Sequence, residues 1–153
     1  MIRKKLFWWA LVVLAVVHTA NVYALNRHLL INVSWIDIPF HLAGGVGVGL
    51  LALWYAELMR TTIKGQVPWW WWLEKVFFIT AFFTLGWEVF EACFMYFPRQ
   101  PFPPGYVADT IKDIGNGWLG AFAAYGAFYK VQWDIWRAGP TQRGSHSMAA
   151  PDQ

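Results

Sequence analysis

The chain has 153 residues, enough for one domain, and its 58% apolar and 20% aromatic content is too high for an ordinary soluble domain of that length. Its net charge of +3, without a basic stripe of interleaved aromatic residues, argues against a nucleic-acid partner. Cys93 is the single cysteine, which excludes an intrachain disulfide and a cysteine-based metal cage. The class that remains is an integral membrane protein.

The first predicted membrane span covers residues 6–25, about the length that a helix needs to cross the hydrocarbon core. Its basic start and apolar run also resemble a cleaved signal peptide, and that alternative stays open. His18 and Asn21 interrupt the apolar run and favour a retained helix. We expect these two side chains to form hydrogen bonds with neighbouring helices rather than to bind a ligand.

The second predicted span covers residues 35–58 and is rich in glycine after its first two turns. Glycines at this density lower helix propensity but let another helix approach closely in a bilayer. The alternative is a phosphate-binding loop, but the segment lacks the strand and the lysine that such a loop requires. The glycines therefore indicate a packing surface.

The third and fourth predicted spans cover residues 70–97 and 106–129. The proline-rich loop 98–104 between them cannot be helical, so we expect a stiff extended crossing outside the membrane. Residues 131–137 are expected to form an interfacial end-piece. The prediction is an all-α, polytopic membrane bundle of four transmembrane helices over residues 1–137, followed by a polar, disordered tail at 138–153.

The basic residues predict how this bundle is oriented. Nine of the twelve Lys and Arg residues fall on one side if the two termini and the loop near Arg60 share that side, and three fall on the other. The positive-inside rule then places both termini in the cytoplasm. The nine are Arg3, Lys4, Lys5, Arg60, Lys64, Lys75, Lys130, Arg137 and Arg143, and the three are Arg27, Arg99 and Lys112.

Acidic and polar residues gather at the opposite, extracytoplasmic level of all four predicted spans, with His18 and Asn21 in the first. At about 1.5 Å of rise per helical residue, all of them lie in the outer part of a core about 30 Å thick. Their spacings of three and four residues place them on common helix faces, which predicts a carboxylate-rich pocket open to the outside. The candidate site residues are Asp37, His41, Glu88, Glu91, Asp109, Asp113 and Asn116.

Structural roles compete with site roles at several of these positions. Asp37 would also serve as a helix cap, Asp109 as a first-turn acid favoured by the helix dipole, and His41 as a packing residue. Glu88 and Asp113 are deeper in their spans, where an unpaired carboxylate is costly, so they favour a functional role. We expect a divalent cation, Mg²⁺ or Ca²⁺, because these ions prefer oxygen ligands. Its predicted ligands are Glu88, Asp109 and Asp113, together with Asp37.

The order of these motifs resembles that of the VanZ-like superfamily of small bacterial membrane proteins, in particular its YjdF-like branch. The matching pieces lie between about residues 35 and 125: Trp35-Ile36-Asp37 with Phe40-His41, the pair Glu88 and Glu91, and GYVADTIKDIGNGWLGA from Gly105. The resemblance implies a protein of four or five spans in the cell inner membrane, associated with the cell envelope. The name-giving member of the family is linked to glycopeptide-antibiotic resistance.

Three function classes remain open from the sequence. The first is an enzyme at the outer membrane face that hydrolyses or transfers a lipid or lipid-linked envelope intermediate, with a bound divalent cation and His41 as acid and base. The second is a binding or transport protein in which the closely spaced carboxylates take up protons or a cationic ligand. The third is an accessory subunit whose acids pair with a membrane protein partner. No nucleophilic serine motif or HExxH motif specifies a reaction.

Overall fold

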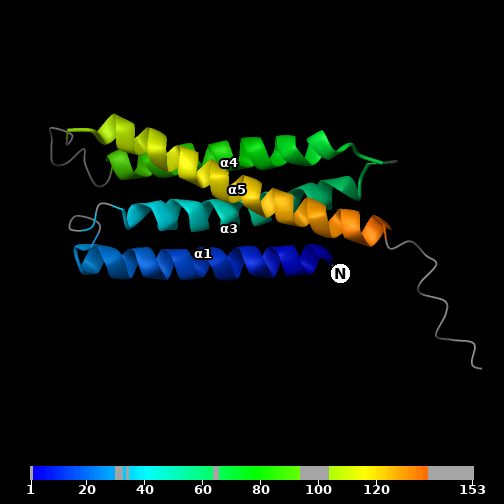
Figure 1. The fold of residues 1–153 in the computed structure, drawn as a ribbon, viewed down its shortest axis with the longest axis horizontal. Coiled ribbons are helices and arrows are strands. Elements are labelled where there is room, and N and C mark those ends of the chain that lie inside the picture. Colours follow the sequence, from blue (N-terminus) through cyan, green and yellow to red (C-terminus); the bar gives the residue numbers. More distant parts are fainter. Residues whose placement is uncertain (1, 30–32, 34, 64–65, 94–103, 138–153) are drawn as a thin grey trace, which may run out of the picture.

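A computed structural model describes residues 2–29, 33, 35–63, 66–93 and 104–137. Within these residues the chain is all-α, with four helices and no strand, as the sequence predicts. The helices lie lengthwise beside one another in an elongated bundle (Figure 1). They are α1 (Ile2–Asn26), α3 (Asp37–Arg60), α4 (Trp69–Glu91) and α5 (Tyr106–Arg137).

The first two helices begin and end within a few residues of the predicted spans. α4 ends at Glu91, and the predicted continuation over 94–97 lies outside the described residues, as do most of the loop 98–104 and the tail 138–153. The end-piece expected at 131–137 is helical and continues α5 without a break to Arg137, and its interfacial position stays a prediction. No glycine or proline lies between Lys130 and Arg137, so nothing in the sequence ends the helix at the expected place.

α3 is the central helix, and it packs against all three of the others. Its closest partner is α5, and small residues form the seam between them. A Cβ atom on Gly45 would overlap the carbonyl group of Gly117, and one on Gly120 would overlap the carbonyl oxygen of Leu42. These two glycines let the two backbones touch, as predicted for a packing surface.

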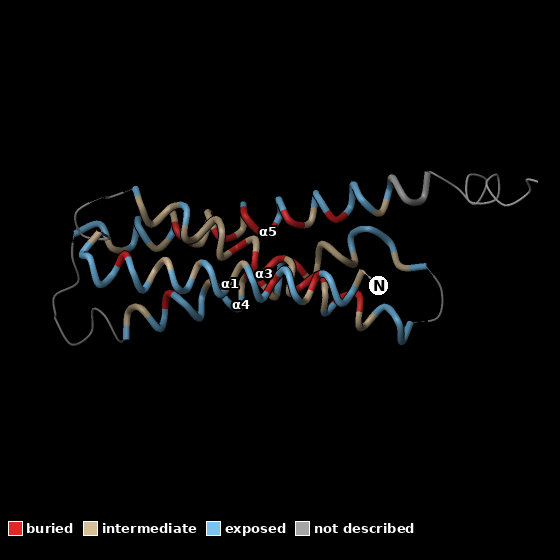
Figure 2. Tube along the Cα trace, turned by 90° about the horizontal axis from the view of Figure 1, so that it is seen from below, coloured by how far each residue is buried: buried red, intermediate tan, exposed pale blue. Residues whose placement is uncertain are grey.

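The buried core is small and runs along α3 and the middle of α5 (Figure 2). Leu53, Val76 and Ala121 are among its fully buried residues. Large apolar side chains lie instead on the outside, and Phe82 is 75% exposed. α1 and α3 are long and apolar enough to cross a membrane, whereas α4 and α5, which carry several charged residues, do not meet that criterion in the described part of the chain.

Four consecutive tryptophans, Trp69 to Trp72, begin α4, and only the first two are exposed. Trp69 and Trp70 are exposed, but Trp72 packs on Phe128 of α5 with ring centroids 5.2 Å apart. The hydroxyl of Tyr125 donates a hydrogen bond to the carbonyl oxygen of Trp69 at 3.1 Å. These contacts fix α4 against α5 at this end of the bundle.

The candidate residues lie at the other end, where α1 and α4 finish and α3 and α5 begin (Figure 1). α5 starts directly after Gly105, whose φ of +86° lies in the region that glycine adopts most readily. The carbonyl oxygen of Gly105 accepts a hydrogen bond from the amide of Asp109, so the turn and the first helical turn are joined. This turn sets where the first residues of α5 meet α3.

Candidate carboxylate–histidine site

The centre of the site is His41, which lies between carboxylates from two helices. Its Nε2 atom is 3.3 Å from Oδ1 of Asp37, one turn earlier on α3. The same Nε2 atom is 3.7 Å from Oδ2 of Asp113 on α5. The predicted pairing of Asp37 with His41 is therefore present, and the packing of α3 on α5 adds Asp113.

Asp113 is the most buried of the three residues, with 3% of its side chain exposed. Its Oδ1 atom has no hydrogen-bond partner in the described part of the chain, and the nearest cation is Nζ of Lys112 at 3.5 Å. A buried carboxylate oxygen without a hydrogen bond is costly. Asp113 is therefore a candidate to bind a metal ion or a hydrogen-bond donor that is not part of the protein.

Asp109 does not join this group. Its side chain is 54% exposed and accepts a hydrogen bond from Lys112. At about 100° per residue, Asp109 is rotated by about 80° from the buried Gly117, whereas Thr110 is rotated by about 20°. Thr110, the residue after Asp109 on α5, thus faces inward instead, and the expectation that all five acids project inward together is wrong for Asp109.

The two glutamates of α4 differ in their surroundings. Glu88 is 7% exposed and faces Thr110 of α5, within electrostatic range of His41. Glu91 is half-buried at the last position of α4 and lines a cavity that it shares with Asp37. Glu88 thus faces α5, whereas Glu91 faces the cavity.

Asn116 lies on α5 three residues after Asp113. Its amide nitrogen is buried and has no hydrogen-bond partner among the described residues. No ion pair or hydrogen bond between described residues joins it to His41 or to the acids. The predicted role of Asn116 in the pocket has no contact to support it.

Three donor atoms meet closely enough to share one metal ion. Among the described residues, Asp37, His41 and Asp113 each offer one ligand atom, and all three atoms lie within 4.8 Å of one another. Ligands about 2.0–2.2 Å from a tetrahedral metal ion lie about 3.4 Å apart, close to the separations of 3.3 and 3.7 Å at His41. The set differs from the predicted ligands in that Glu88 and Asp109 are outside it and a histidine nitrogen is inside it.

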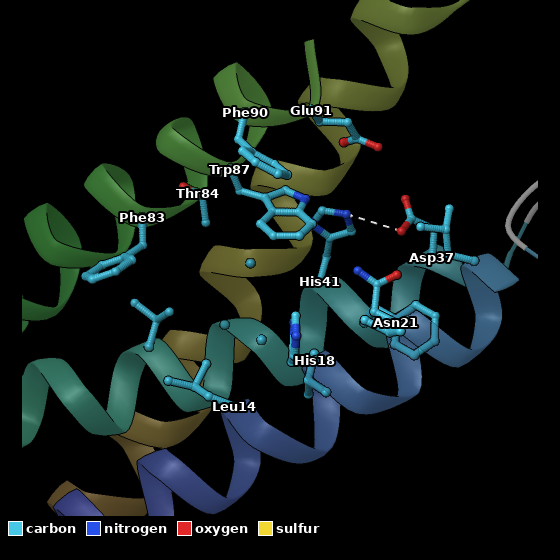
Figure 3. A pocket seen from close by; sticks show the side chains of 18 residues that line it. Leu14, His18, Asn21, Asp37, His41, Phe83, Thr84, Trp87, Phe90 and Glu91 are labelled. Carbon is cyan, nitrogen blue, oxygen red and sulfur yellow. Dashed lines mark ion pairs between the residues drawn. The ribbon is translucent and has the colours of Figure 1, made fainter. Parts of the chain in front are cut away.

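A cavity of about 410 Å³ opens beside this cluster, between α1, α3 and α4. Asp37, His41 and Glu91 lie at its polar end, and Figure 3 shows His18 and Asn21 of α1 on the side across from Phe90 and Glu91 of α4. Leucine, valine and aromatic side chains line the rest. The side chains of His18 and Asn21 form no hydrogen bond or ion pair with another residue in the described ranges, contrary to the interhelical bonds expected of them.

The sequence did not predict the cavity, the two aromatic residues that line it, or the position of Thr110, which faces Glu88 outside the cavity lining. Phe83 and Trp87 line the cavity, although aromatic residues of this kind would be expected to face lipid. Thr110 was overlooked, although its spacing of three from Asp113 is the signal that places it on the same face. The cavity itself has no signal in the sequence, because it depends on how far α1 and α4 stand apart.

No family model, no curated protein and no solved structure matches this chain. The resemblance to the VanZ-like superfamily therefore stays a prediction that rests on the motifs quoted for it.

Proposed function

We propose that the protein is a multi-pass membrane protein that binds a lipid or lipid-linked ligand at an extracytoplasmic site holding a divalent metal ion. The observation that carries this proposal is the position of the metal-capable donors. Asp37 and His41 belong both to the donor set and to the lining of an otherwise largely apolar cavity. A ligand with an apolar part in the cavity would therefore present its polar part to the metal ion.

Support for a membrane location comes from the outer surface of the bundle. Many large apolar side chains are exposed on α1 and α4, among them Trp8, Val16, Phe78 and Phe82. A soluble monomer rarely exposes apolar area on this scale. The distribution of Lys and Arg described above supports four spans with the site on the side opposite the termini.

The donor set favours a transition-metal ion over the Mg²⁺ or Ca²⁺ that the acids alone suggest. Mg²⁺ and Ca²⁺ are bound almost wholly through oxygen, whereas Zn²⁺ and Mn²⁺ accept a histidine nitrogen together with carboxylates. Three protein ligands leave a coordination position open for a ligand or a water molecule. A metal ion held in this way would act as a Lewis acid on a phosphate or carbonyl oxygen of the bound ligand.

Metal analysis of the detergent-purified protein tests the proposal. The parent chain should retain about one Zn²⁺ or Mn²⁺ per molecule, and its melting temperature should rise when that ion is added. Asp113→Asn should lose both properties, because it removes the buried carboxylate ligand. Asp109→Asn is the matched control on the same helix and should keep both, since Asp109 is exposed and outside the donor set.

Absence of a bound ion from the parent, or equal retention in the two variants, would contradict the metal site. One observation would then favour a second function, proton-linked binding. The same Nε2 atom of His41 faces two carboxylates, so a proton on that atom would join Asp37 and Asp113. In that case His41→Gln, and not metal removal, should abolish ligand binding.

A further inference from the structure

The cavity lies between two helices that have little contact with each other. α1 packs on α3 and has no extensive contact with α4 or α5 in the part of the chain that the structure describes. Val22 and Leu25 of α1 and Phe83 and Trp87 of α4 line the cavity and are each partly exposed. The cavity is therefore open on the side of the bundle, between α1 and α4.

The length of the cavity matches one leaflet of a bilayer. Its lining residues on α1 run from Leu14 to Leu25, which is about 17 Å of helix, and those on α4 run from Phe83 to Glu91, about 12 Å. Half of a hydrocarbon core about 30 Å thick is about 15 Å. The apolar part thus reaches from the polar end of the bundle to about the middle of the membrane.

Two polar side chains on the wall lack partners within the protein. His18 and Asn21 are three residues apart on one face of α1 and point towards the cavity in Figure 3. Their side chains form no hydrogen bond with any other described residue. Polar groups in a membrane need partners, so a ligand that binds here should carry hydrogen-bonding groups a short distance below its head.

Two carboxyl groups lie at the polar end of the cavity. Asp37 and Glu91 line it, and no lysine or arginine is among the described residues that line the cavity. Glu91 is not one of the proposed metal ligands, so it stays available for a cationic group whether or not a metal ion is bound. Charge complementarity therefore favours an ammonium group at this position.

We infer that the cavity is a lateral binding cleft for a membrane lipid with an amine head group. One acyl chain lies between α1 and α4, the ester region meets His18 and Asn21, and the ammonium group pairs with Glu91. This inference rests on the proposed membrane function, but it does not require the metal ion. It names the ligand class that the proposed function leaves open.

Photo-cross-linking in nanodiscs tests where the acyl chain of the bound lipid lies. The probe is a phosphatidylethanolamine with a diazirine in the middle of one acyl chain, incubated with the full-length protein in EDTA. Cross-links should map to the cavity faces of α1 and α4 around Leu14, Val17 and Phe83. Cross-links spread evenly over the outer faces of the helices would overturn the cleft.

Glycine substitutions supply matched variants for this experiment. Gly44 lines the cavity and a Cβ there would meet nothing closer than 4.0 Å, so Gly44→Leu should fold and fill the space. Gly126→Leu is the control, because a Cβ there meets nothing within 4 Å and the residue is outside the cavity lining. Cavity cross-links should fall about tenfold in Gly44→Leu and not in the control.

Equal cross-linking in these two variants would overturn the inference. If Gly44→Leu does not elute as a folded protein in size-exclusion chromatography, Val17→Phe fills the same space from α1 and should give the same loss. Unlabelled phosphatidylethanolamine should compete with the probe in EDTA better than phosphatidylglycerol of the same chain length. Equal competition by the two lipids would overturn the amine assignment.

Glu91→Gln should remove the preference for phosphatidylethanolamine, while the acyl chain of the probe should still cross-link in the cleft. Glu74→Gln, on the same helix but outside the cavity lining and paired with Lys75, should keep the preference. Metal content is measured separately on lipid-free protein in detergent. Lipid cross-linking without metal retention would contradict the metal site alone, and metal retention without cavity cross-links would contradict the cleft alone.

Discussion

At the scale of single residues, His41 is where the two halves of the site meet. Asp37 approaches it along the same helix, and Asp113 approaches it across the α3–α5 seam. The i,i+4 spacing of Asp37 and His41 is visible in the sequence, and helix geometry alone brings these two together. The contact with Asp113 depends on the rotation of α5 about its axis, which spacing along one helix does not determine.

Glu88 is a metal ligand in the set predicted from the sequence but not in the set that the geometry favours. It is buried and lies on α4, outside the donor set. We therefore expect Glu88→Leu to insert and fold, because replacing a buried carboxylate with an apolar group removes a desolvation cost. Its melting temperature should still rise on addition of Zn²⁺ or Mn²⁺.

Differential scanning fluorimetry with and without the metal ion checks this expectation. Asp113→Asn in the same assay should show no metal-dependent rise. If Glu88→Leu instead behaves like Asp113→Asn, the ion is held by the glutamate, and the ligand set expected from the sequence would be the better one.

At the scale of secondary-structure elements, the α3–α5 seam positions the site. Gly45 meets Gly117, and Gly120 meets the backbone around Leu42, so the two helices cannot separate or rotate without losing these contacts. The seam begins about one helical turn after His41 on α3 and about one turn after Asp113 on α5. Changes in the seam should therefore affect both stability and the geometry of the site.

Alanine substitutions in α5 should have opposite effects at two glycines. Gly120→Ala puts a methyl group into the carbonyl oxygen of Leu42 and should destabilise the fold by about 1–3 kcal/mol. Gly126→Ala meets open space and should be neutral or stabilising by up to about 1 kcal/mol, because alanine favours the helix. Thermal unfolding in one detergent measures both, and equal destabilisation of the two variants would show that the seam does not limit the packing.

At the scale of the whole molecule, the bundle has its site at one end and most of its basic residues at the other. The ends of α1 and α4 and the starts of α3 and α5 share the site end. Arg60, the last residue of α3, lies at the opposite end and pairs with Glu57 at 2.8 Å. The proposed orientation puts the site outside the cytoplasm.

Cysteine labelling in intact cells checks this orientation. In a Cys93→Ser background, Pro104→Cys at the exposed turn before α5 should react with a membrane-impermeant maleimide. Thr62→Cys, in the exposed turn after α3, should react only after lysis. The reverse pattern would place the site in the cytoplasm, and labelling of both positions in intact cells would contradict the single membrane crossing by α4 that separates them.

The sequence by itself determined the helical class, the approximate bounds of the helices and the level at which the polar residues gather. These properties follow from local hydrophobicity, from glycine and proline positions and from a rise of about 1.5 Å per residue. It also paired Asp37 with His41, because residues four apart share a helix face.

Only the tertiary structure decided which acids meet. Asp109 and Asp113 are equally compatible with one stripe in the sequence, but the rotation of α5 against α3 buries Asp113 and exposes Asp109 beside Lys112. The cavity likewise depends on the separation of α1 from α4, which no residue spacing within one helix encodes. Contacts between helices are set by how complete faces pack, and this is the physical reason why the site required the fold.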